Sequence, residues 1–185
     1  MNIILGSSSP RRKELLAAMG FEFRTMSPDI DESFSDEMPV ENVPAFLAES
    51  KANALADSLE KNDLLICSDT VVVLNNKILG KPSDTQNAFE ILRQLSGNKH
   101  KVITGVALKS IEKTSVFSVH TNVSFSELSD QQIRYYIEKF QPFDKAGSYG
   151  IQDWIGLIGV KKIEGSYSNV MGLPTFELNK AILSF

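Results

Sequence analysis

A short polar and basic segment, GSSSPRRK at residues 6–13, follows the first apolar run of the chain. A helix beginning at Pro10 would present unpaired backbone N–H groups and a partial positive charge beside these hydroxyl and guanidinium groups. Arginines in a first helical turn oppose the helix dipole, which a purely structural helix would avoid. We therefore expect an anion site with Ser7, Ser9 and Arg12 as ligands, against the alternative of a capped helix with solvent-exposed charges.

A second group of residues could bind a polyphosphate or activate water. Asp69 lies between two apolar runs, where a carboxylate at the end of a buried strand could hold a metal or act as a general base. A structural turn aspartate is the commoner alternative. Lys51, Lys81 and Lys145 are candidate phosphate ligands, although a lone lysine is more often exposed. Together, these cations and few carboxylates suit a polyphosphate bound with a divalent metal.

Composition excludes several function classes. The 185 residues carry 19 Lys and Arg against 23 Asp and Glu, for a net charge of -4, which argues against binding to nucleic acid polymers. A single cysteine excludes an intrachain disulfide, and two separated histidines match no zinc spacing. The sequence has no P-loop, GxGxxG, GxSxG or HExxH motif. With no signal peptide and no apolar run of about 18 residues, we expect a cytoplasmic enzyme that binds small molecules and no membrane.

The elements that must position these residues alternate between helix and strand. Patterns of hydrophobicity and turn residues predict strands at 3–5, 21–26, 64–67, 70–74, 78–79, 101–108, 116–125 and 158–163, and helices from Pro10 to Gly20 and at 43–61, 84–95, 129–140 and 174–183. Asn75-Asn76 predicts a tight hairpin, and Ser129 with Gln132 predicts a capping box. We expect an α/β fold with a mixed sheet, in one unit of two lobes around a cleft.

The motifs that carry chemistry match one family in their order along the chain. SSSPRR at 7–12, ESKA at 49–52, SDTVV at 68–72, GKP at 80–82, DKAG at 144–147, YGIQ at 149–152 and NVMGLP at 169–174 are the matching stretches. On these segments the chain resembles the Maf-like nucleoside triphosphate pyrophosphatases, over essentially its whole length.

That resemblance implies a fold, a reaction and a setting. It implies one Maf-like domain over residues 1–185, with an elongated mixed central sheet, flanking helices and a nucleotide cleft between two lobes, similar to inosine triphosphate pyrophosphatases. The expected reaction is hydrolysis of a nucleoside triphosphate at the α-phosphorus, giving the monophosphate and pyrophosphate. A divalent cation (Mg²⁺ or Mn²⁺), a cytoplasmic location and often a homodimer are also implied.

The resemblance also assigns roles to individual residues. Asp69 matches the proposed proton acceptor of the family, and it could instead hold the metal, with Glu32 of the acidic segment 27–39 as the second carboxylate. Positions matching Arg11, Thr70 and Gln152 mark the substrate class, and all three resemble the dTTP/UTP branch.

Hydrogen-bond complementarity supports a pyrimidine base. Uracil and thymine place an N–H donor between two carbonyl acceptors, and the amide of Gln152 can match that edge. The branch resembling 7-methylguanosine triphosphate pyrophosphatases carries Glu there, which suits the N–H donors of guanine. This chain departs from the family in having Asp153-Trp154 after the glutamine, and a carboxylate at Asp153 could alter base preference.

Two other functions stay open, and two reactive side chains are expected to be structural. The same chemistry could serve to remove modified pyrimidine nucleotides, or the protein could be a nucleotide-binding regulator of cell division and septum formation. We expect a structural hydrogen bond for His100 and small core packing for Cys67.

Overall fold

Seven strands form one mixed sheet in the computed structural model, which describes all 185 residues. The strand order is β2-β1-β3-β5-β6-β7, and β4 pairs with β3. The chain divides into two compact units. Residues 1–70, 104–119 and 172–185 form the first unit, and residues 71–103 and 120–171 form the second. No helix of the chain has the length and apolar character that crossing a membrane requires.

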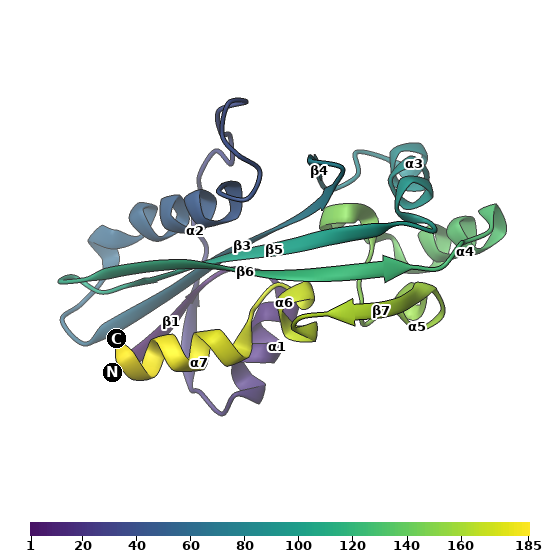
Figure 1. Ribbon diagram of the computed structural model, residues 1–185. Helices are drawn as coiled ribbons and strands as arrows, with labels where there is room; N and C mark the ends of the chain where they lie inside the picture. The colour runs from purple at the N-terminus through teal and green to yellow at the C-terminus, as the bar shows by residue number, and fades with distance from the viewer. The chain divides into compact units, whose positions relative to one another are not determined.

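In the first unit, helices cover both faces of the sheet. β1 (Asn2–Gly6) pairs in parallel with β2 (Phe23–Met26) and with the first part of β3 (Asp63–Leu74). Side chains alternate along β1: Ile3 and Leu5 pack with α1 (Pro10–Ala18) and α7 (Thr175–Ser184), whereas Ile4 packs with α2 (Val43–Ala54). Figure 1 shows α2 on one side of these strands and α1 and α7 on the other.

The second unit has its own core. After a turn at Asn75-Asn76, β3 pairs with β4 (Lys77–Leu79), and β6 (Thr114–Phe125) pairs with β7 (Val160–Glu164). β5 (Lys99–Lys109) has residues in both units. The other elements of the second unit are α3 (Thr85–Leu95), α4 (Asp130–Phe140), α5 (Trp154–Gly159), α6 (Tyr167–Met171) and 3₁₀ turns at Pro142–Asp144 and Ala146–Ser148. A further 3₁₀ turn at Ala56–Ser58 belongs to the first unit. Tyr136 of α4 is fully buried in this core.

Several local predictions are confirmed. The first helix begins at Pro10, and both residues of the Asn75-Asn76 turn have positive φ, which suits a tight hairpin. The helix predicted at 84–95 is present as α3, and the Asp84 side chain caps it by accepting a hydrogen bond from the backbone N–H of Asn87. Ser129 and Gln132 form the expected capping box of α4.

Three predicted elements differ from the structure. The helix predicted at 43–61 ends at Ala54, and Leu59 still packs against the same core from extended backbone. The apolar run predicted as a strand at 158–163 begins inside α5 and becomes a strand only at Val160. The sequence did not predict α6. β3 runs without a break through residues 68–70, so Asp69 lies inside a strand and not at its end. Sheet pairing there outweighs the low strand propensity of the polar residues.

Candidate active site

The candidate active site of the first unit is built where β1 ends beside the middle of β3. Leu5 pairs with Ile66, so the chain leaves β1 next to the polar residues 68–70. The carboxyl ends of parallel strands are the usual ligand-binding edge of an α/β sheet. Ser7 is buried at this point, and α1 begins three residues later with no acidic residue in its first turn.

Arg12 is held at this edge by three acceptors. Its Nε donates to the Gly172 carbonyl at 2.9 Å, Nη2 to Thr70 Oγ1 at 3.2 Å, and Nη1 to Ser7 Oγ at 3.4 Å. Thr70 Oγ1 lies 2.9 Å from Thr104 Oγ1, which fixes the threonine in turn. Burial lowers the pKa of Arg12, and the charge of Asp69 opposes that effect. The guanidinium is therefore preorganised, with two of its five N–H groups left for a ligand.

Lys51 joins two carboxylates. Its Nζ lies 2.5 Å from Asp69 Oδ1 and 2.7 Å from Glu32 Oε1. The side chains of Lys51 and Asp69 are 9% and 12% exposed, so this pair is largely shielded from water, whereas Glu32 is half exposed. Asp69 Oδ2 makes no hydrogen bond and is the free oxygen of the carboxylate.

A glycine on the neighbouring strand sets the position of α2 and hence of Lys51. A Cβ at Gly105 would lie 2.2 Å from the backbone carbonyl carbon of Pro44, so the first turn of α2 packs directly on β5. Lys51 follows about two helical turns later on the same buried face. Any larger residue at position 105 would displace the helix that carries the lysine.

The two carboxylates on Lys51 have the donor chemistry of a Mg²⁺ or Mn²⁺ site. Carboxylate oxygens are hard ligands, and Mg²⁺ is commonly held by one or two of them together with substrate phosphates. No group of three His, Cys, Asp or Glu side chains that could hold a metal occurs in the chain. Asp69 and Glu32 therefore fit a metal that binds together with a phosphate ligand.

The structure brings together Ser7, Arg12, Glu32, Lys51, Asp69 and Thr70 within the first unit, with Ser9 at the start of α1 and Arg11 beside Arg12. Sequence reasoning missed Ser68 and Thr104 as members. Ser68 is fully buried and donates to the same Gly172 carbonyl as Arg12. Only the strand pairing and the return of the chain at residue 172 reveal these contacts.

Lys81, Lys145 and Gln152 belong to the second unit. Lys81 is exposed, and the preceding Gly80 accepts a hydrogen bond at 3.1 Å from the N–H of Gly147. This bond ties the segment of Lys81 to that of Lys145. The ammonium of Lys145 lies 2.8 Å from Asp144 Oδ1 and 3.9 Å from Asp153 Oδ2.

The carboxylate of Asp153 is already bound. Its Oδ2 accepts a hydrogen bond of 2.7 Å from Tyr136 Oη, whereas the carbonyl Oε1 of Gln152 is buried and has no partner. Of these two side chains, Gln152 is therefore the one with an unpartnered oxygen. The carboxylate beside it contributes to holding the backbone.

His100 and Cys67 have structural environments. His100 Nε2 lies 2.7 Å from Tyr149 Oη, and burial lowers the pKa of His100 to about 4. Burial raises the pKa of the Cys67 thiol to about 12, and the residue packs with Ile4 and Ala48 under α2. Neither group carries a charge at neutral pH.

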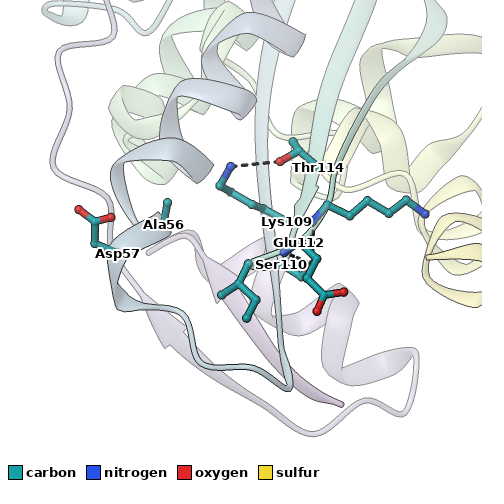
Figure 2. Close-up of a pocket in the computed structure, with 8 residues that line it drawn as sticks. Ala56, Asp57, Lys109, Ser110, Glu112 and Thr114 are labelled. Atoms are coloured by element: carbon teal, nitrogen blue, oxygen red, sulfur yellow. Dashed lines mark hydrogen bonds between the residues drawn. The ribbon is translucent and has the colours of Figure 1, made fainter.

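A pocket of about 340 Å³ lies elsewhere in the first unit, between the 3₁₀ turn at Ala56–Ser58 and the β5–β6 turn. Lys109 Nζ donates to Thr114 Oγ1 across this turn at 3.1 Å. Figure 2 draws this bond as a dashed line. Lys113, which also lines the pocket, donates to the backbone oxygen of Phe185 at 3.4 Å. None of the candidate site residues lines this pocket. Its lysines stabilise the turn and the end of the chain.

A comparison with known protein families shows the family to which the chain belongs. The family model described as Maf-like protein matches residues 2–185. The chain belongs to the Maf-like protein family. It is 47% identical over 178 residues to the dTTP/UTP pyrophosphatase of Bacteroides thetaiotaomicron, covering 95% of this chain and 92% of that protein. It is 46% identical over 186 residues to the dTTP/UTP pyrophosphatase of Porphyromonas gingivalis, covering 99% and 94%.

Solved structures confirm the expected fold class of this Maf-like chain. A HAM1 protein from Coxiella burnetii matches with a TM-score of 0.58 at 13% identity, over 100% of both chains. The Staphylococcus aureus Ham1 protein matches with a TM-score of 0.54 at 14% identity, over 100% of this chain and 98% of the other. At these identities the likeness concerns the fold alone.

Proposed function

We propose that this protein is a nucleoside triphosphate pyrophosphatase that hydrolyses dTTP and UTP to the monophosphate and pyrophosphate. The observation that carries the proposal is the shielded Lys51–Asp69 pair in the same unit as the preorganised Arg12. A fixed carboxylate with one free oxygen beside an anion-binding edge is what water-dependent cleavage of a phosphoanhydride requires. The names of the Maf-like relatives support dTTP and UTP as the substrates.

The phosphates would bind where α1 begins. The free N–H groups at the start of α1 attract anions, and no acidic side chain of its first turn opposes them. Arg12 adds two N–H donors in a plane fixed by its three acceptors, so binding costs little side-chain entropy. Ser7 and Ser9 complete this set. Lys81 and Lys145 are proposed as further phosphate ligands.

Asp69 is the proposed general base. Lys51 holds Oδ1, which leaves Oδ2 to accept a proton from a water molecule. The water oxygen forms a bond to the α-phosphorus while the bond from that phosphorus to the bridging oxygen breaks. The bridging oxygen leaves with pyrophosphate, and the proton passes from Asp69 to solvent. Arg12 stabilises the negative charge that develops on the phosphoryl oxygens.

A divalent cation would be held by Glu32 and the phosphates, with Asp69 as the second carboxylate in the alternative in which Asp69 binds the metal and is not the general base. When bound, Mg²⁺ or Mn²⁺ supplies positive charge that lowers the repulsion between the triphosphate and an approaching nucleophile. Glu32 lies on a long polar loop, and its side chain is half exposed.

The base would be recognised by Gln152, whose carbonyl oxygen is unpartnered and so can accept the N3–H of uracil or thymine. Arg11 and Thr70 are proposed as the other specificity positions, and the hydroxyl of Thr70 acts there by holding Arg12. We also propose that the chain is a single Maf-like domain and that two copies form a homodimer. The proposed location is the cytoplasm, where nucleoside triphosphates are made and used.

A substrate panel tests this proposal. Pyrophosphate release is measured from UTP, dTTP, CTP, GTP, 7-methyl-GTP and the triphosphate of 5-methyluridine, each with Mg²⁺ and with Mn²⁺. We expect the highest kcat/KM for UTP and dTTP. Equal or faster turnover of GTP or 7-methyl-GTP would overturn the choice of base, and release of inorganic phosphate in place of pyrophosphate would overturn the reaction.

A further inference from the structure

The turn that carries Gln152 is closed by one buried hydroxyl from another helix. The N–H of Asp153 donates to the Gly150 carbonyl at 3.0 Å, which makes residues 150–153 a tight turn with Gln152 at its third position. Tyr136 Oη accepts a hydrogen bond from the Gly150 N–H at 3.0 Å and donates to Asp153 Oδ2 at 2.7 Å. The single hydroxyl therefore joins both ends of the turn.

This hydroxyl is held as a neutral donor. Tyr136 is fully buried on α4, and burial with the nearby Asp153 carboxylate raises the pKa of Tyr136 well above its usual value. Asp153 lies at the N-cap of α5, where an aspartate normally accepts from the helix N–H groups, yet its side chain makes no such bond. The carboxylate of Asp153 accepts the hydrogen bond from Tyr136 instead.

The side chain of Gln152 packs closely on the turn. A Cβ at Gly150 would lie 2.5 Å from Asp153 Oδ2 and 2.9 Å from Gln152 Nε2, so both side chains fold over the glycine. The opposite end of the amide, Oε1, is then the buried and unpartnered oxygen. Only a residue without a side chain at position 150 leaves room for this arrangement.

Orientation of an amide decides which pyrimidine it accepts. A glutamine that presents its carbonyl oxygen to position 3 of the ring accepts the N–H of uracil or thymine. Turned by 180°, the same amide presents a donor to N3 of cytosine. A freely rotating Gln152 would therefore bind both bases, and a fixed one binds uracil and thymine.

We propose that Tyr136 is a positioning residue that gives the enzyme its selectivity for uracil and thymine over cytosine, by pinning the 150–153 turn through Gly150 and Asp153. This inference rests on the proposed function, because it takes Gln152 as the residue that contacts the base. Tyr136 acts through the turn and does not touch the substrate.

The test compares Tyr136→Phe with Tyr135→Phe, a matched control whose ring is exposed and packs on Trp154. UMP and CMP affinities are measured by calorimetry, and kcat and KM are measured for UTP and CTP. We expect Tyr136→Phe to weaken UMP binding and raise the KM for UTP about tenfold, the value of one or two lost hydrogen bonds. Affinity for CMP and kcat should change little, so the UTP to CTP preference falls, and Tyr135→Phe should match the wild type.

A second pair of variants keeps the proposal testable should Tyr136→Phe fail to fold. Asp153→Ala removes the acceptor of the Tyr136 hydroxyl at a less buried position and should lower the same preference. Asp153→Asn keeps an acceptor oxygen and should restore it. Unchanged UMP to CMP preference in Tyr136→Phe or Asp153→Ala overturns this inference alone, as does an equal loss for both bases. A wild type that binds CMP as well as UMP overturns the proposed base recognition and this inference with it.

Discussion

The ammonium nitrogen of Lys51 lies 2.5 Å from Oδ1 of Asp69, and the two side chains are almost entirely shielded from water. A buried ion pair is costly to form, because both charges lose their hydration. The Lys51–Asp69 pair therefore contributes little to stability, but it fixes the position of the Asp69 carboxylate. Variants of Asp69, Lys51 and Glu32 each perturb this pair or the second carboxylate on Lys51.

Asp69→Asn should abolish turnover while leaving the fold intact. The amide cannot take a proton from water, so kcat should fall at least about a thousandfold, within the range of a lost general base. Pyrophosphate release at saturating UTP measures the effect. Asp57→Asn, an exposed aspartate of the same unit, is the control and should retain full activity. Hydrolysis by Asp69→Asn at the wild-type rate would exclude Asp69 as the base.

Lys51→Met should lower both activity and stability. Removing one partner leaves a carboxylate shielded from water without its counter-charge, which costs about 3 kcal/mol of unfolding free energy. Chemical denaturation with fluorescence detection measures the loss. The double variant with Asp69→Leu should regain most of that stability and remain inactive, because an apolar pair replaces the ionic one. A fully stable Lys51→Met single variant would contradict the shielded pair.

Acidification should destabilise the protein through His100. Burial lowers the pKa of His100 from 6.5 to about 4, so between these values the unfolded chain binds a proton that the folded chain does not. This contribution is fully present above pH 6.5 and is lost as the pH falls toward 4, by about 3 kcal/mol. Unfolding free energies of the wild type and His100→Gln at several pH values give the difference. Parallel pH profiles would show that His100 titrates normally.

Glu32→Gln should raise the metal concentration needed for activity. The residue offers a half-exposed carboxylate oxygen beside Asp69, and the amide is a weaker ligand for a hard cation. We expect about a tenfold higher Mg²⁺ concentration at half-maximal rate, with a similar maximal rate. Titration of Mg²⁺ and of Mn²⁺ after treatment with a chelator measures this. Activity that survives complete removal of divalent cations would contradict a metal requirement.

Local signals predicted much of the fold. Pro10, the Asn75-Asn76 turn and the Ser129 capping box each act over a few residues, and the structure has all three. The predictions that were wrong depend on contacts distant in sequence. β3 continues through Asp69 because neighbouring strands complete its pairing, and α2 ends early because Leu59 reaches its core from extended backbone.

The same distinction applies to the site. Arg12, Lys51 and Asp69 were expected from their residue types and from the motifs that match the family. Tyr136 and Ser68 were not, because tyrosine on a helix and serine in a strand are unremarkable until the residue that each one bonds is known. Asp153 was expected to bear on the preference for a nucleobase, and the structure adds that its carboxylate accepts a hydrogen bond from Tyr136.

Hydrolysis of UTP in ¹⁸O-labelled water tests the central claim most directly, because the product that gains the label shows which phosphorus is attacked. The wild-type enzyme is incubated with UTP and Mg²⁺ to completion of a single turnover, and both products are analysed by mass spectrometry. Attack at the α-phosphorus places one ¹⁸O in UMP and none in pyrophosphate. Label in pyrophosphate, or in released inorganic phosphate, would contradict the account.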